Sequence, residues 1–208
     1  MGGGNWGQFL VSKLSELRGV DPHVYEPAED SYLLLRVAHE TVTEDQLVVD
    51  VGTGSGFLAE RLREQLGVRV VGVDVNPHAC RRAVEAGVPT IRGHVVTAIR
   101  DSTVDVVVCN PPYLPTAEAR TGNAWFDRAL DGGTAGRAIV TALVAELPRV
   151  LGPGGCALLL VSSAMGIEAV TAHAEQAGFD VRVVAEDRYP DERLAVLQLA
   201  SSPTPRSA

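Results

Sequence analysis

Short apolar runs and helical patterns alternate along most of this chain, and this alternation is the feature that most constrains its fold. Seven runs are strand candidates, at 47–52, 68–74, 89–93, 104–110, 156–162, 180–188 and 192–200. Helical patterns lie between them at 57–67, 77–87, 136–151 and 165–179. Strands that alternate with helices form a parallel sheet that is covered on both faces, so the sequence predicts an α/β fold.

The last two strand candidates break this alternation. The link Asp187–Glu192 is too short for the crossover helix that parallel neighbours need, so we predict an antiparallel hairpin there. The predicted architecture is a seven-stranded, mostly parallel sheet with helices on both faces and a C-terminal antiparallel hairpin. A chain of 208 residues suits one domain, which we place at 25–200. The N-terminal segment 1–24 is expected to be partly flexible and the tail 201–208 disordered.

The composition is that of an acidic globular protein. Apolar residues make up 46% and charged residues 21%, and no run approaches the ~18 apolar residues of a membrane span. We therefore expect a cytoplasmic protein without membrane contact. The net charge of −8 disfavours nucleic acid as a partner, because binding phosphates needs a basic surface. Cys80, Cys109 and Cys156 form no CxxC pair, so no metal site is predicted.

A glycine-rich turn follows the first predicted strand. The stretch VVDVGTGSG (48–56) places Gly52, Gly54 and Gly56 in a G-x-G-x-G pattern. Phe57 stands where a dinucleotide-binding loop would carry its last glycine, so the nicotinamide pattern is not met. Glycine permits a positive φ and lets a ligand approach the backbone. The turn therefore marks a ligand site of another kind, although a purely structural turn is the alternative.

Two acidic residues flank this turn at the ends of neighbouring strands. Asp50 precedes Gly52 by two residues, and Asp74 ends the next strand. A carboxylate at the second strand end can accept hydrogen bonds from both hydroxyls of a ribose. Asp50 would repel a pyrophosphate but suits a ligand that carries a cation or an amino group. The two acids and the glycine loop together predict a site for S-adenosylmethionine, which has a ribose, an amino acid tail and a sulfonium.

The fourth predicted strand ends in an unusual step, VCNPPYL (108–114). The side-chain oxygen of Asn110 can accept one N–H of a substrate –NH₂ group, and the carbonyl of Pro111 can accept the other. Tyr113 can lie against a flat substrate group. Such a clamp suits the amide of glutamine or the exocyclic amine of adenine, and it acts by orientation and polarisation. A rigid turn with a chance asparagine is the alternative.

Several motifs together resemble a known family. DVGTGSG, VGVDVNP and VVVCNPPY, in this order, are similar to the class I methyltransferases that modify amino groups, in particular the HemK-like glutamine methyltransferases. VYEPAEDSYLLL (24–35) is similar to the eukaryotic and archaeal branch, which methylates the Gly-Gly-Gln loop of peptide-chain release factors, and the resemblance continues through ALDGGTAGR (129–137).

This resemblance implies the class I methyltransferase fold and S-adenosylmethionine as the cofactor. The implied catalytic residues are Asn110, Pro111 and Tyr113. The implied cofactor contacts are Ser31, Asp50, Gly52, Gly54, Asp74, His94, Val95 and Asn110.

The chain departs from the family at two places. His94 stands where the family usually has the aspartate that binds the adenine amine, while Val95 keeps an apolar contact to the ring. Only about 25 residues precede YEPAED, whereas the bacterial release-factor enzymes carry a helical N-terminal domain. The match is therefore to the compact branch, whose eukaryotic members work with a small zinc-binding activator subunit. Such a subunit is an expected partner of this chain.

The leading hypothesis is an S-adenosylmethionine-dependent N-methyltransferase that acts on the side-chain amide of a protein glutamine, with a release factor as substrate. An adenine-N6 methyltransferase acting on DNA or RNA is one alternative, but it would need a basic rim. A non-catalytic subunit that binds S-adenosylmethionine is the other, and His94 is the feature that invites it. The stretch 115–128 is expected to form part of the rim that meets the acceptor.

Overall fold

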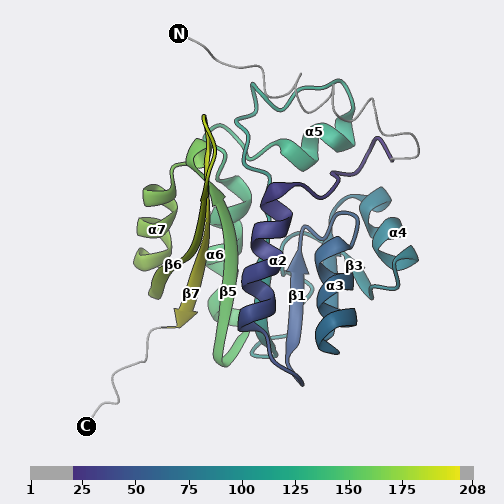
Figure 1. The fold of residues 1–208 in the computed structure, drawn as a ribbon, viewed down its shortest axis with the longest axis vertical. Helices are drawn as coiled ribbons and strands as arrows, with labels where there is room; N and C mark the ends of the chain where they lie inside the picture. Colours follow the sequence, from purple (N-terminus) through teal and green to yellow (C-terminus); the bar gives the residue numbers. More distant parts are fainter. Residues whose placement is uncertain (1–20, 202–208) are drawn as a thin grey trace.

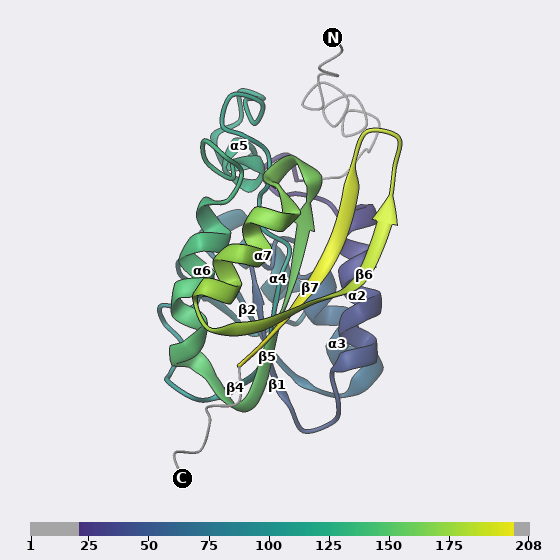
Figure 2. The same ribbon diagram turned by 90° about the vertical axis from the view of Figure 1, so that its left-hand side faces the viewer.

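The computed structural model describes residues 21–201 as a twisted sheet between two layers of helices (Figures 1 and 2). The strands are β1 (Leu47–Val51), β2 (Arg69–Asp74), β3 (Thr90–Arg92), β4 (Val104–Cys109), β5 (Leu151–Ser162), β6 (Phe179–Arg188) and β7 (Arg193–Ser201). Their order is β3-β2-β1-β4-β5-β7-β6, and β7 is antiparallel to both of its neighbours. The predicted fold is thus confirmed. Most of the predicted terminal segments 1–24 and 201–208 lies outside the described residues, since 1–20 and 202–208 are not described.

Helices cover both faces of the sheet because the strands are apolar on both sides. The helices are α2 (Glu29–Thr41), α3 (Phe57–Leu66), α4 (Pro77–Glu85), α5 (Ala124–Leu130), α6 (Ala138–Val150) and α7 (Ile167–Gln176), with a 3₁₀ turn η1 (Ser163–Met165). On one face, α6 and α7 pack on side chains such as Val49 and Leu159. On the other, α2 and α3 pack on Val48 and Leu158. Among residues 21–201, no helix is both long enough and apolar enough to cross a membrane.

The register of the central strands positions the site. β1 lies between β2 and β4, and Val51 is paired with Val73 on one side and with Cys109 on the other. The glycine loop after β1, the turn after β2 and the Asn-Pro-Pro-Tyr step after β4 therefore leave the sheet at the same edge. Open α/β sheets bind their ligands at this carboxyl edge.

Three local features were not predicted. β5 begins before the predicted strand 156–162: its ladder passes from Val104–Leu151 to Val106–Cys156, so GPGG (152–155) bulges out of the strand. The helix α2 begins at Glu29, just after Pro27 and Ala28. The stretch 115–128 contains the start of α5, a helix that was not predicted.

Candidate cofactor and acceptor site

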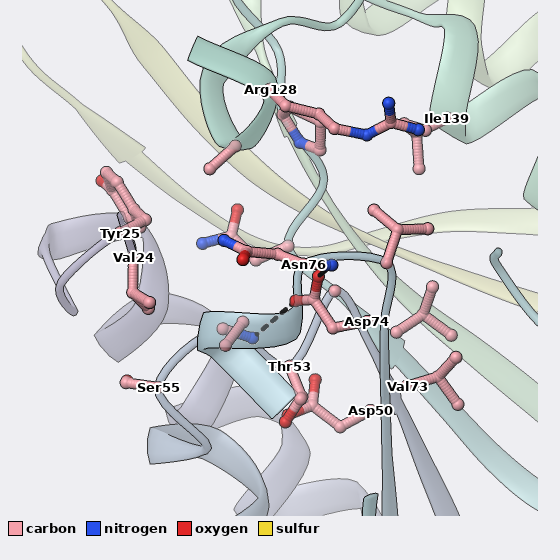
Figure 3. A pocket seen from close by; sticks show the side chains of 18 of the residues that line it. Val24, Tyr25, Asp50, Thr53, Ser55, Val73, Asp74, Asn76, Arg128 and Ile139 are labelled. Carbon is pink, nitrogen blue, oxygen red and sulfur yellow. Dashed lines mark hydrogen bonds between the residues drawn. The ribbon is translucent and has the colours of Figure 1, made fainter. Parts of the chain in front are cut away.

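A cavity of about 380 Å³ lies at the carboxyl edge of β1, β2 and β4 (Figure 3). It is lined by every residue predicted to contact the cofactor: Ser31, Asp50, Gly52, Gly54, Asp74, His94, Val95 and Asn110. Pro111 and Tyr113 are not among its lining residues, whereas Pro112 is. The fold therefore brings the predicted cofactor contacts together, whereas two of the three predicted catalytic residues do not line this cavity.

The glycine loop depends on glycine at all three positions. Gly52, Gly54 and Gly56 have φ angles of 73°, 55° and 83°, a region that other residues rarely adopt. The N–H of Gly52 donates to the carbonyl of Val73 at 2.8 Å, which ties the loop to β2. A Cβ on Gly56 would lie 2.9 Å from the Cα of Ala83 in α4, so the loop also packs closely on that helix.

Asp74 connects the loop to the second strand end and still faces the cavity. Its Oδ2 accepts the backbone N–H of Gly54 at 3.0 Å, and its Oδ1 accepts that of Asn76 at 2.8 Å. Burial raises the pKa of Asp74 above its usual value, against these hydrogen bonds, which lower it. Each carboxylate oxygen has a further lone pair, so the side chain can also accept hydrogen bonds from the two hydroxyls of a ribose.

Asp50 is the most buried acid of the cavity, with 3% of its surface exposed. Its Oδ2 accepts the hydroxyl of Thr53 at 2.7 Å. Burial raises the pKa of Asp50 to about 7; the Thr53 hydrogen bond opposes this shift, and the nearby charge of Asp74 adds to it. No ion pair among residues 21–201 includes Asp50. A ligand that carries positive charge would therefore offset the burial of this carboxylate.

The opposite wall can take a flat apolar group. Val73 and Val95 are buried side chains that line the cavity, and Val95 has a positive φ of 42°. His94 is exposed at the rim, and its carbonyl accepts both the N–H and the hydroxyl of Thr97. The residues present thus fit S-adenosylmethionine: Asp74 suits the ribose, the valines suit the adenine ring, and Asp50 suits the positive charge.

Asn110 is held by a chain of hydrogen bonds from α2. Its Nδ2 donates to the Oγ of Ser31 over a long 3.4 Å, and Ser31 donates to Oδ1 of Asp30 at 3.1 Å. Asp30 is 2% exposed, and its other oxygen accepts the hydroxyl of Tyr25 at 3.1 Å. Because this chain engages the Asn110 amide nitrogen, the Asn110 side-chain oxygen stays available to accept an N–H in the cavity.

Pro111 and Tyr113 are the chain neighbours of the lining residue Pro112. Pro111 is buried, and the half-buried Tyr113 packs against all three apolar clusters of the protein. Burial raises the pKa of Tyr113 well above its usual value, so the phenol stays protonated. Direct contacts of these two residues with an acceptor remain predictions.

The outer wall of the cavity was predicted only as the stretch 115–128, without its individual residues or its helix. Trp125, Arg128 and Ala129 of α5 line it, and so does Asp131 just after that helix. Figure 3 shows Arg128 across the opening from Asp74. The usable signal was Asn123, whose side chain caps α5 by accepting the N–H groups of Trp125 and Phe126. A helix of seven residues is too short to show a clear period.

Comparisons with known proteins assign this architecture to a family. Residues 48–133 match a model described as a methyltransferase domain. A putative protein N5-glutamine methyltransferase of Methanocaldococcus jannaschii is 34% identical over 85% of this chain and 91% of its own length. Methyltransferase HEMK2 of Mus musculus is 28% identical over 89% of this chain and 93% of its own length.

The solved structures agree. One chain of the E. cuniculi Mtq2–Trm112 complex, which is responsible for methylation of the termination factor eRF1, superimposes with a TM-score of 0.69 and 30% identity. The match covers 86% of this chain and 99% of that one. A ribosomal protein L11 methylase from Lactobacillus delbrueckii shares only 15% identity at a TM-score of 0.60, which shows the fold alone. The chain belongs to the HemK-like release-factor glutamine methyltransferase family and is an S-adenosylmethionine-dependent methyltransferase.

Proposed function

We propose that the chain methylates the side-chain amide nitrogen of a protein glutamine, and that the substrate is the Gly-Gly-Gln loop of a peptide-chain release factor. The observation that carries this proposal is the position of Asn110. It follows β4 at the cavity wall, and its amide nitrogen is tied to Ser31. An asparagine oxygen fixed in this way is suited to an amide acceptor, which must be oriented because its nitrogen is a poor nucleophile.

S-adenosylmethionine supplies an electrophilic methyl group on a sulfonium when it is bound. The role of Asn110 is to accept one N–H of the substrate amide, so that the nitrogen lone pair faces the methyl carbon. In the transfer a carbon–sulfur bond breaks, a carbon–nitrogen bond forms, and the nitrogen gives up one proton. Asp30 acts as a positioning residue, because it reaches Asn110 only through Ser31, whereas Ser31 also lines the cavity.

The relatives support the same substrate class. The Methanocaldococcus jannaschii protein is described as a putative protein N5-glutamine methyltransferase, and several bacterial relatives are release factor glutamine methyltransferases. This chain spans 63% of the Geobacter sulfurreducens enzyme but 91% of the Methanocaldococcus jannaschii protein. Its extent therefore matches that of the archaeal protein.

Methyl-labelled S-adenosylmethionine offered with three acceptors tests the proposal. The acceptors are a release factor with its Gly-Gly-Gln loop, the same factor with alanine in place of the glutamine, and adenine-containing DNA. We expect label on the first alone. Label on DNA would overturn the proposal in favour of an adenine-N6 methyltransferase. Tight cofactor binding without transfer to any acceptor would instead support a non-catalytic subunit.

Asn110→Ala tests the role of the clamp. We expect transfer to fall by about 100-fold or more, because the amide loses its orienting acceptor, while calorimetry shows cofactor binding retained. Gln198→Ala is the matched control, since it removes an amide side chain of β7 that does not line the cavity. Equal loss of cofactor binding and transfer in Asn110→Ala would show that Asn110 only supports the fold.

A small activator subunit is the partner we propose. The E. cuniculi relative was solved as a complex with Trm112, and this sheet has two open edges, at β3 and at β6. Apolar side chains are exposed near both: Val84 on α4, which packs beside β3, and Val183 and Val184 on β6. Co-expression with a Trm112-type protein, for the wild type and for Val84→Glu and Val183→Glu, tests this. Loss of the complex in one variant alone would identify the edge, and no complex with the wild type would refute the partner.

A further inference from the structure

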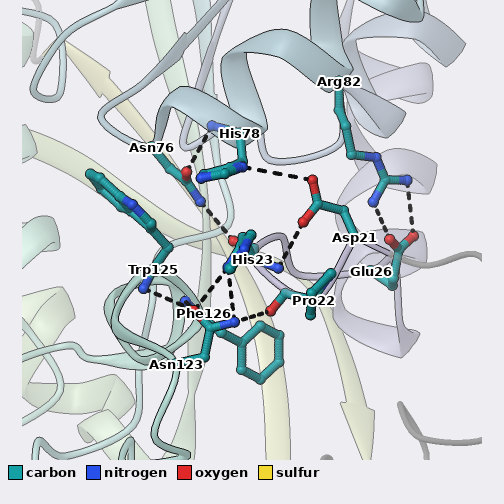
Figure 4. Close-up of polar contacts among 10 residues, drawn as sticks. All are labelled: Asp21, Pro22, His23, Glu26, Asn76, His78, Arg82, Asn123, Trp125 and Phe126. Carbon is teal, nitrogen blue, oxygen red and sulfur yellow. Dashed lines mark hydrogen bonds and ion pairs between the residues drawn. The ribbon is translucent and has the colours of Figure 1, made fainter.

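The segment 21–26, which lines the cavity with Val24 and Tyr25, meets the first turn of α4 and the start of α5 (Figure 4). This meeting brings together Asp21, His23 and His78, and one potential ligand atom of each lies within 4.8 Å of those of the other two. His78 lies far along the chain from the other two, so no spacing in the sequence indicates this cluster.

We propose that Asp21, His23 and His78 form a binding site for a divalent transition metal of the zinc class. Imidazole nitrogen and carboxylate oxygen are donors that Zn²⁺ prefers, and three protein ligands leave one tetrahedral position for water. The bound ion would join the segment 21–26 to α4. This site is separate from the glycine loop, and the bound ion would have a structural role.

Each of the three residues is already held by a hydrogen bond, and each keeps one side-chain atom free to bind a metal ion. Oδ1 of Asp21 accepts the backbone N–H of His23 at 2.9 Å, and Oδ2 lies 4.0 Å from Nδ1 of His78. The backbone N–H of His78 donates to Oδ1 of Asn76 at 2.9 Å, which fixes the start of α4. Nδ1 of His23 lies 3.0 Å from Oδ1 and 2.9 Å from Nδ2 of Asn123, so the Asn123 amide engages this ring nitrogen and leaves Nε2 for a metal ion.

The charges of the cluster favour a bound cation. The rings of His23 and His78 have centroids 4.3 Å apart, so both imidazoles are within reach of a single ion. Arg82, the neighbouring cation on α4, is paired with Glu26 through two hydrogen bonds. The carboxylate of Asp21 is therefore available to a metal ion.

The cluster is continuous with the wall of the cavity. Val24 and Asn76 are neighbours of the proposed ligands along the chain, and both line the cavity. The Nδ2 of Asn76 donates to the carbonyl of His23 at 2.7 Å. An ion at this position would thus hold the outer wall in place, and it would raise the melting temperature of the full chain by mass action.

Titration of the full, chelator-treated chain with zinc chloride in a calorimeter tests the proposal. For the wild type we expect equimolar binding, and with cobalt chloride we expect the visible absorption bands of a tetrahedral nitrogen–oxygen site. His78→Ala and Asp21→Asn should weaken zinc binding by more than about 10-fold. His39→Ala is the matched control, because His39 is exposed at the end of α2 and should leave binding unchanged.

Asp21→Asn guards against misfolding, because its side-chain oxygen can still accept the N–H of His23. Circular dichroism of the metal-free variants confirms that they are folded before titration. The proposal is overturned if the wild type takes up no zinc or cobalt, or if folded His78→Ala and Asp21→Asn bind zinc as tightly as the wild type. Neither measurement requires methyl transfer, so the outcome is independent of the proposed glutamine substrate.

Discussion

The two halves of the cavity are built in different ways. The cofactor half consists of the glycine loop 52–56 and the acids Asp50 and Asp74, and it is held by hydrogen bonds between the ends of two adjacent strands. The acceptor half consists of residues 110–137. There Leu114 exchanges backbone hydrogen bonds with Leu130 and Gly132, across a loop and a short helix.

Because of this difference, we expect substitutions in the two halves to have different effects. In the cofactor half, the atoms that would bind the ligand are also the atoms that close the sheet edge, so a substitution should affect stability and cofactor binding together. In the acceptor half, the loop can shift without disturbing the sheet. A substitution there should reduce methyl transfer while cofactor binding remains. Four substitutions test this comparison.

Asp50→Asn should have the largest effect on the free energy of unfolding. The pKa of Asp50 is raised from 3.8 to about 7, so between these pH values the folded chain binds more protons than the unfolded one. The free energy of unfolding of the wild type should therefore fall as the pH rises from about 4 to about 7, by on the order of 4 kcal/mol. The variant lacks this titration.

Urea denaturation of both proteins across this pH range measures the difference. Asp191→Asn, which removes an exposed acid between β6 and β7, should keep the pH profile of the wild type. Parallel pH profiles of Asp50→Asn and the wild type would show that burial of the Asp50 carboxylate does not destabilise the folded chain.

Gly56→Ala should be the next most damaging. Its φ of 83° costs a non-glycine residue about 1–2 kcal/mol, and the new Cβ would lie 2.9 Å from the Cα of Ala83. Because of this overpacking as well, we expect the free energy of unfolding to fall by about 3 kcal/mol in total and cofactor binding to weaken. Gly67→Ala is the matched control, because φ is +68° there and nothing lies within 4 Å of the new Cβ. Chemical denaturation should show that the free energy of unfolding of this control falls by only about 1 kcal/mol. Equal losses would remove close packing as the cause.

The cofactor half could be predicted from the sequence because its signals are local. The positive φ of Gly52, Gly54 and Gly56 follows from three glycines in five residues. Asp50 and Asp74 are each the last or next-to-last residue of a strand, and parallel neighbours bring such positions to one edge. The buried state of Asp50 was not predicted, because it depends on how the loop covers the strand end.

The acceptor half could be predicted only in part. The sequence indicated Asn110 at the cavity wall because a strand end and two prolines mark it. It did not indicate that Pro111 and Tyr113 would be absent from the cavity lining, or that a helix, α5, would form part of the outer wall. Both depend on contacts between residues distant in sequence, such as the pairing of Leu114 with Asp131. A single sequence contains no period or spacing that encodes such a contact.

Gly136→Ala tests the acceptor half directly. A Cβ on Gly136 would clash with the carbonyl oxygen of Tyr113, so the Asn-Pro-Pro-Tyr step must move. A displacement of about 1 Å at the clamp reduces transfer by about 100-fold, equivalent to about 2.7 kcal/mol of barrier. Cofactor affinity should stay near that of the wild type. Gly122→Ala, with φ of +92° but open space around the new Cβ, is the control in the same segment. Calorimetry measures cofactor affinity in both variants, and a transfer assay measures methyl transfer. If Gly136→Ala lost cofactor binding in parallel with transfer, the distinction between the two halves would be wrong.

Glu26→Gln should have the smallest effect on stability. It removes the contact that attaches the segment 21–26 to α4. Glu26 and Arg82 form a two-point ion pair, and their side chains are 21% and 29% exposed. Because water screens such a pair only in part, we expect a loss of about 0.5–1 kcal/mol that shrinks as salt is added. Glu168→Gln is the matched control: Glu168 pairs with Arg193 but is 80% exposed, so its loss should not be measurable. Thermal denaturation at low and high salt compares the two. An effect of Glu26→Gln that did not depend on salt would mean that the segment is held by packing of Val24 and Tyr25 rather than by charge.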